Sequence, residues 1–126
     1  MEPILCLDFD GVIHSYTTPW SDAKIIPDPL VPGAMQFIAE AAKEFTVAIY
    51  SSRMSSYDGR VAVIQWVLAE IYKHFGESEA RDLFASIKFP EAKPPAFVTL
   101  DDRAITFTGI WPDLKALKEF KPWNKC

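Results

Sequence analysis

The fold of this chain is decided near its N-terminus by the stretch Ile4-Leu5-Cys6-Leu7-Asp8-Phe9-Asp10-Gly11. Its first four residues form an apolar run that is typical of a buried strand. Because side chains on a strand point to alternate faces, the carboxylates of Asp8 and Asp10 project in the same direction where the strand ends. Two like charges held together are costly unless a cation joins them, so this pair indicates a divalent metal. Gly11 then allows a sharp turn and leaves the neighbouring backbone open to a ligand.

The composition is that of an ordinary globular protein. The 126 residues predict one domain over residues 1–126, with 49% hydrophobic and 24% charged residues. A net charge of -4 argues against extended binding to nucleic acid, which needs a basic surface. Cys6 and Cys126 do not form a disulfide framework, and no leader-like or long apolar segment follows Met1. We therefore expect a cytoplasmic protein with no membrane partner.

Apolar periodicity predicts strands that alternate with helices. The strands are expected at residues 3–9, 45–50, 87–89, 96–100 and 105–108, and the helices at 33–44, 59–74, 78–84 and 113–120. This alternation favours an α/β fold of three layers, in which helices cover both faces of a mostly parallel sheet. Trp111 and Trp123 are expected to pack around the last helix.

Polar side chains follow the predicted strands at their carboxyl ends, where ligands bind in open parallel sheets. These residues are Asp8, Asp10, Ser51, Asp101 and Asp102, and Lys93 stands in the loop before the strand at 96–100. A carboxylate can attack phosphorus when a metal and fixed polar groups neutralise the phosphoryl oxygens, and a second carboxylate can move protons. The set therefore predicts phosphoryl-transfer chemistry.

In order and spacing, these residues resemble the four motifs of the haloacid dehalogenase superfamily of phosphohydrolases. Asp8-Phe9-Asp10-Gly11 is similar to the first motif, Ser51 to the second, Lys93-Pro94 to the third and Asp101-Asp102 to the fourth. The resemblance covers about residues 4–108 and implies a Rossmann-like domain. Residues 12–32 and 52–93 leave no room for the cap domain that many members insert, so a capless member with an open site is implied.

The resemblance also implies a role for each residue. Asp8 would be the nucleophile and a Mg²⁺ ligand, and Asp10 the general acid/base, binding the metal through its backbone carbonyl. Ser51 would hydrogen-bond the phosphoryl group, and Lys93 would hold the nucleophile and the phosphate. Asp101 and Asp102 would complete the metal shell, while Gly11, Ser52 and Arg53 are lower-ranked contacts for the substrate.

The implied activity is Mg²⁺-dependent hydrolysis of a phosphomonoester through an aspartyl-phosphate. A nucleotide, a nucleic-acid end or another phosphomonoester would be the substrate, and a homo-oligomer partner would cover the open site. Two other functions stay open, a phosphoacceptor signalling domain and a catalytically inactive binding domain. The choices of phosphatase or phosphotransferase, Ser51 or Ser52, and Lys93 or Lys88 are also open. His14 receives no catalytic role, because Asp10 already supplies the acid.

Overall fold

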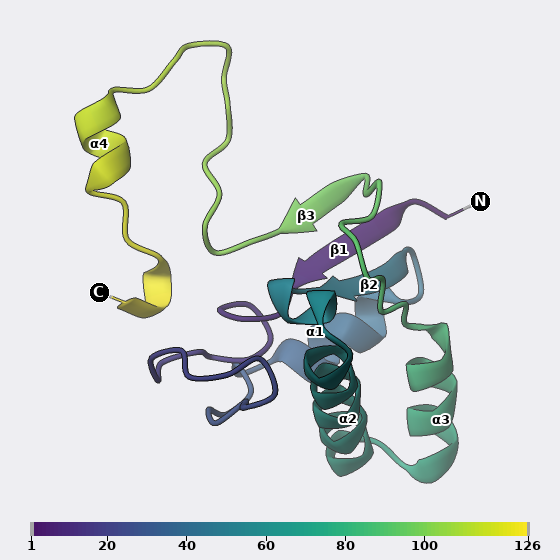
Figure 1. Cartoon of the computed structure of the whole chain (residues 1–126). Coiled ribbons are helices and arrows are strands. Elements are labelled where there is room, and N and C mark those ends of the chain that lie inside the picture. The colour runs from purple at the N-terminus through teal and green to yellow at the C-terminus, as the bar shows by residue number, and fades with distance from the viewer. Residues whose placement is uncertain (1, 126) are drawn as a thin grey trace.

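The computed structural model describes residues 2–125, with side chains for residues 2–124. Its centre is a parallel sheet of three strands, β1 (Ile4–Asp8), β2 (Thr46–Tyr50) and β3 (Val98–Leu100), in the order β2-β1-β3 (Figure 1). In the register of this sheet, Leu5 lies beside Val47 of β2 and Val98 of β3. The α/β class and the parallel sheet are thus confirmed, and the sheet is compatible with a Rossmann-like fold.

The central strand is β1 because its apolar run can be buried on both faces. Leu5, Cys6 and Leu7 are all buried. Leu5 and Leu7 join the main hydrophobic core, while Cys6 lies on the opposite face. A continuous apolar run of this kind is characteristic of a strand inside a parallel sheet.

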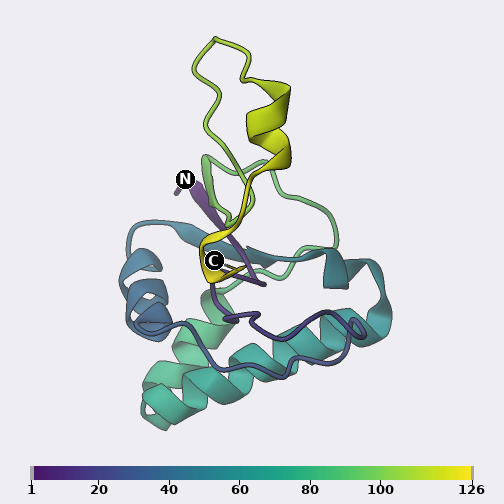
Figure 2. The same ribbon diagram turned by 90° about the vertical axis from the view of Figure 1, so that its left-hand side faces the viewer.

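Three helices cover the face that carries Leu5 and Leu7 (Figure 2). They are α1 (Ala34–Ala41), α2 (Tyr57–His74) and α3 (Glu77–Ser86), and a 3-10 turn, η1 (Ser52–Ser55), leads into α2. The buried side of α2 carries Val63, Val67 and Ile71 at a spacing of four residues, which places one apolar stripe against the sheet. Ser56 caps this helix by accepting a hydrogen bond from the Gly59 backbone N–H at 3.1 Å.

The opposite face of the sheet carries no helix among the described residues. The chain runs from β1 to β2 and onward to Lys88, which forms an isolated bridge with Ala48 in place of the expected strand at 87–89. Segment 89–97 then crosses back over this face to β3 as coil (Figure 1). The expected third layer is therefore a coil, because a crossover that contains a helix needs about a dozen or more residues and this segment has nine.

This path reverses the direction of winding between β1 and β3. Parallel crossovers are right-handed, so connections that step in opposite directions across a sheet lie on opposite faces. The connections of β1 and β3 consequently lie on opposite faces of the sheet. A crevice therefore opens beyond the carboxyl ends of these two strands. Asp8 and Asp101 stand at the two sides of that crevice.

After β3 the chain leaves the sheet as an extended arm, residues 104–122, which includes the short helix α4 (Leu114–Lys118) (Figure 1). It returns through η2 (Trp123–Lys125), where Trp123 Nε1 donates a hydrogen bond to the Gly11 carbonyl at 2.7 Å. The strand expected at 105–108 is absent, since nothing in the sheet pairs with it. The expected packing of Trp111 is also wrong, because this side chain is 84% exposed.

In the described part of the chain, no helix has both the length and the apolar character needed to cross a membrane.

We expect the helical layer to carry most of the stability, which a matched pair of truncations tests. Ile71 of α2 is fully buried, whereas Ile25 in the long loop is exposed. Ile71→Ala should lower the free energy of unfolding by about 2–5 kcal/mol, because it leaves a cavity. Ile25→Ala should lower it by less than about 1 kcal/mol. Urea denaturation measures both, and equal losses would contradict this description of the core.

Candidate functional site

Three acidic side chains meet at the crevice between β1 and β3. Carboxylate oxygens of Asp8, Asp101 and Asp102 all lie within 4.8 Å of one another. They open onto a cavity of about 430 Å³. The cavity is lined by Asp8, Asp10, Tyr16, Trp20, Tyr50, Ser51, Ser52, Asp101, Asp102 and Arg103. The structure therefore brings together the predicted residues at the ends of all three strands.

Asp102 is the most unusual member of this cluster. Its side chain is only 1% exposed, and its nearest cation, Arg103 Nε, lies 3.9 Å from Oδ2. By hydrogen-bond geometry neither of its oxygens has a partner among the described residues, and the donor that a protonated cluster offers is the carboxyl group of Asp8 itself. A buried carboxylate without a donor is strongly unfavourable, so these two oxygens are available to a cation.

Gly11 makes room for Asp102. Its φ of +88° lies in the left-handed region that glycine adopts without strain, and a Cβ atom there would overlap the Asp102 carboxylate. Gly11 was predicted as a substrate contact, and it does not line the cavity. The close approach of the Asp102 carboxylate instead explains why a glycine stands at position 11.

Ionisation of Asp8 and Asp102 is disfavoured in this cluster. Burial, followed by the charge of Asp101 and a proton shared with Asp102, raises the pKa of Asp8 to about 8. Burial also raises the pKa of Asp102. Oxygen-rich clusters of this kind suit a hard divalent cation such as Mg²⁺, whose charge favours the ionised carboxylates.

Asp10 belongs to a different group of contacts. Its carboxylate accepts hydrogen bonds from Arg53 Nε at 2.9 Å and Nη2 at 3.1 Å, from His14 Nδ1 at 2.9 Å and from Ser51 Oγ at 3.3 Å. Burial alone would raise the pKa of Asp10, but the hydrogen bonds from His14 and Arg53 outweigh it and hold that pKa below its usual range. Asp10 is therefore an ionised acceptor, and its carboxylate is not part of the three-acid cluster.

His14 orients Asp10, a role that sequence reasoning missed. The imidazole is buried, and its Nε2 accepts the Asp28 backbone N–H at 3.0 Å. Since Nε2 is an acceptor, the proton of the neutral ring is on Nδ1, which donates to Asp10. The only signal in the sequence is the spacing of four residues between Asp10 and His14.

Arg53 was predicted to contact substrate, and the structure does not support that role. The side chain is buried, and its Nη1 donates to the carbonyls of Asp22, Ala23 and Ile25 at 2.7–3.2 Å. Its guanidinium also lies over the Trp20 ring, 4.6 Å from the centroid. With its remaining donors on Asp10, Arg53 ties the long loop after β1 to the end of β2.

Of the remaining predicted residues, the two serines line the cavity and Lys93 does not. Ser51 and Ser52 both line the cavity, and Ser51 Oγ also accepts the Arg53 backbone N–H at 3.1 Å. Lys93 is exposed and forms no hydrogen bond or ion pair with the acidic cluster in the described structure. Burial raises the pKa of the Cys6 thiol, and the nearby charge of Lys93 opposes this rise. Lys88 instead lies beyond β2.

Comparisons with models of known protein families, with curated proteins and with solved structures gave no match to this chain.

The Arg53 contacts lead to a prediction about stability. Arg53→Met leaves the Asp10 carboxylate without its partner in a largely buried site, and should lower the free energy of unfolding by about 3–5 kcal/mol. Arg103→Met is the matched control, because Arg103 is exposed and should contribute less than about 1 kcal/mol. Urea denaturation measures both variants. A loss for Arg53→Met no larger than that of the control would contradict the tethering role.

The raised pKa of Asp8 predicts how stability changes with pH. Its ordinary value is 3.8 and its value in the folded protein is about 8, so the folded state binds more protons than the unfolded state between these values. The free energy of unfolding should therefore fall as the pH rises from about 4 to about 8 in a chelating buffer. Asp8→Asn should flatten this decline and raise stability near pH 8. Thermal melts at a series of pH values test this, and an unchanged decline in the variant would contradict it.

Proposed function

We propose that this protein is a Mg²⁺-dependent phosphomonoester hydrolase that acts through an aspartyl-phosphate on Asp8. The observation that carries the proposal is the buried, donor-free carboxylate of Asp102 beside Asp8 and Asp101, at the mouth of a cavity that contains Ser51. The resemblance of the four motifs to the haloacid dehalogenase superfamily supports the same reaction.

The residues of the acidic cluster fit a hard cation. Asp8, Asp101 and Asp102 would hold Mg²⁺, and the donor-free oxygens of Asp102 argue for this most directly. When bound, the ion would neutralise phosphoryl oxygens and favour the ionised, nucleophilic form of Asp8.

In the first step a carboxylate oxygen of Asp8 attacks the phosphorus atom, and the bond from phosphorus to the ester oxygen breaks as the alcohol leaves with a proton. Ser52 lines the cavity and offers a hydroxyl donor to the phosphoryl oxygens, and Ser51 offers a second once its hydroxyl turns from Asp10. Arg103 also lines it and supplies the positive charge that Arg53, with its donors occupied, does not.

In the second step water attacks the phosphorus, its proton passes to a base, and the bond from phosphorus to Asp8 breaks to release phosphate. Asp10 is ionised and suits the base in this step. To act as the acid in the first step, Asp10 must take up a proton, which requires its bonds with Arg53 to loosen. We therefore expect protonation of the leaving group to be the more demanding task for this site.

The ion pair between Asp10 and Arg53 also favours a second candidate function, a phosphoacceptor domain. If Asp10 stays bound to Arg53 and His14 throughout, hydrolysis of the phosphorylated Asp8 is slow and the modified protein is long-lived. The lifetime of the phosphorylated protein separates the two functions: seconds or less fits the hydrolase, and many minutes fits the phosphoacceptor.

A panel of phosphomonoesters, from an aryl phosphate to nucleotides and phosphate-ended oligonucleotides, tests the proposal by phosphate release with Mg²⁺ or with chelator. Asp8→Asn should abolish release and phosphoprotein formation, while Asp10→Asn should lower kcat by about 10²–10⁴-fold. The control Asp82→Asn changes an exposed carboxylate on α3 and should leave turnover unchanged. A folded protein without turnover or phosphoprotein, or equal turnover by Asp8→Asn, would overturn the proposal.

A further inference from the structure

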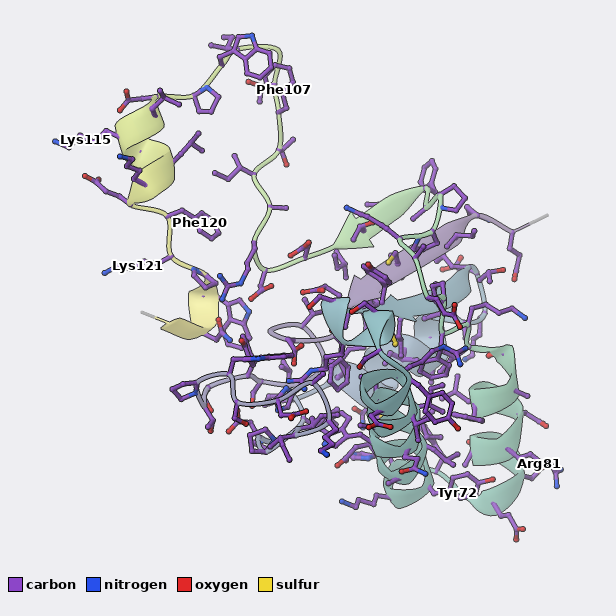
Figure 3. The ribbon with its side chains drawn as sticks, viewed as in Figure 1. Tyr72, Arg81, Phe107, Lys115, Phe120 and Lys121 are labelled. Carbon is purple, nitrogen blue, oxygen red and sulfur yellow. The ribbon has the colours of Figure 1, made fainter. Side chains whose placement is uncertain are left out.

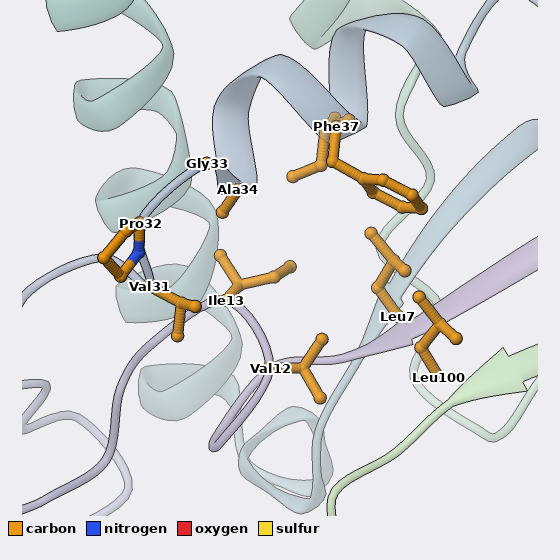
Figure 4. A pocket seen from close by; sticks show the side chains of 10 residues that line it. Leu7, Val12, Ile13, Val31, Pro32, Gly33, Ala34, Phe37 and Leu100 are labelled. Atoms are coloured by element: carbon orange, nitrogen blue, oxygen red, sulfur yellow. The ribbon is translucent and has the colours of Figure 1, made fainter. Parts of the chain in front are cut away.

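One face of the sheet is incompletely covered. By register, Val98 and Leu100 of β3 lie on the same face as Leu5 and Leu7, but no helix in the described structure packs over them. They are 43% and 41% exposed, and Phe37 of α1 beside them is 48% exposed. An apolar hollow of about 220 Å³ lies at this place, with Ile13 in its wall (Figure 4). We call this surface the acceptor face; it consists of Val12, Ile13, Phe37, Val98 and Leu100.

The arm carries the apolar surface that the acceptor face lacks. Trp111 is 84% exposed and Ile110 78% exposed, and the arm encloses an apolar groove of about 760 Å³. Figure 3 shows Phe107 and Phe120 on this arm, away from the body of the molecule. Residues 105–108, Ile-Thr-Phe-Thr, alternate apolar and polar side chains as a strand would. Within the described residues β3 pairs with β1 alone, so its outer edge is open to such a strand.

The charges of the two parts are complementary. The arm, residues 104–122, contains three Lys and Arg against two Asp and Glu, whereas residues 1–103 contain nine against fifteen. Lys115 and Lys121 are among the basic residues on the arm (Figure 3). A net-negative body repels a second body but not this arm, whose net charge is slightly positive, so charge favours association of the arm with a body over that of two bodies.

The apolar area is large enough for a stable dimer. The exposed apolar side chains of the arm and of the acceptor face together present on the order of 1,000 Å² per molecule. Monomeric proteins rarely expose contiguous apolar patches larger than a few hundred Å². A standard protein–protein interface buries about 800 Å² on each partner, so docking the arm would satisfy that requirement.

We propose that the arm of one copy docks on the acceptor face of a second copy, and that the exchange is reciprocal. The arm extends away from the sheet and from the layer of helices (Figures 1 and 2), while its far end stays bound to Gly11 through Trp123. Two copies related by a two-fold axis fill both acceptor faces with both arms and leave these anchors in place. The proposal does not depend on the activity proposed above.

Sedimentation velocity over a wide range of protein concentration tests this. The unmodified chain should be a dimer. Trp111→Glu on the arm and Phe37→Glu on the acceptor face should each weaken dimerisation at least tenfold, because each places a charge in the apolar contact. The control Tyr72→Glu changes a similarly exposed aromatic residue on α2 and should leave the dimer intact. Circular dichroism checks that each variant, altered at an exposed position, stays folded.

Mixing the two weakened variants distinguishes an arm that docks on a second copy from an arm that docks on its own chain. The Trp111→Glu chain keeps an intact acceptor face and the Phe37→Glu chain keeps an intact arm. Their mixture should therefore dimerise more tightly than either variant alone. A chain that is monomeric at every concentration, a dimer insensitive to both substitutions, or a mixture no tighter than its components would overturn the proposal.

Discussion

The buried ion pair between Arg53 and Asp10 is the interaction on which the site depends. Arg53 joins the turn after β1, the end of β2 and the carbonyls of the long loop, and neutral His14 holds Asp10 from the other side. Removing one partner of such a pair leaves a charge in a poorly solvated place, so the pair enforces one arrangement of these segments. The acidic residues therefore divide into Asp10, which Arg53 and His14 hold, and the three-acid cluster of Asp8, Asp101 and Asp102.

The path of the chain explains why the three-acid cluster forms. Asp8 and Asp101 are far apart in sequence, yet β1 and β3 are neighbours and point the same way. The reversal of winding between these two strands keeps their connections from closing over the carboxyl ends. The coil at 89–97 makes this reversal. A chain of this length can therefore form the crevice with helices on one face of the sheet and coil on the other.

Much of this could be predicted from sequence, where the signal is local. β1, β2 and α2 were predicted within a few residues because burial gives them continuous or periodic apolar patterns. The meeting of Asp8 with Asp101 followed from the rule that parallel strands end at one edge. The strand at 105–108 has the right alternation, but pairing depends on a distant partner that no pattern reveals. The role of Arg53 was missed because backbone carbonyls of a distant loop determine it.

The raised pKa of Asp8 has a consequence for how the site is loaded. At neutral pH the empty cluster retains a proton, so an entering cation must displace it, and the two compete for the same carboxylates. Uptake of a cation would then acidify a weakly buffered solution, and apparent affinity would weaken as the pH falls. A cation held by these carboxylates would take the place of the proton on Asp8.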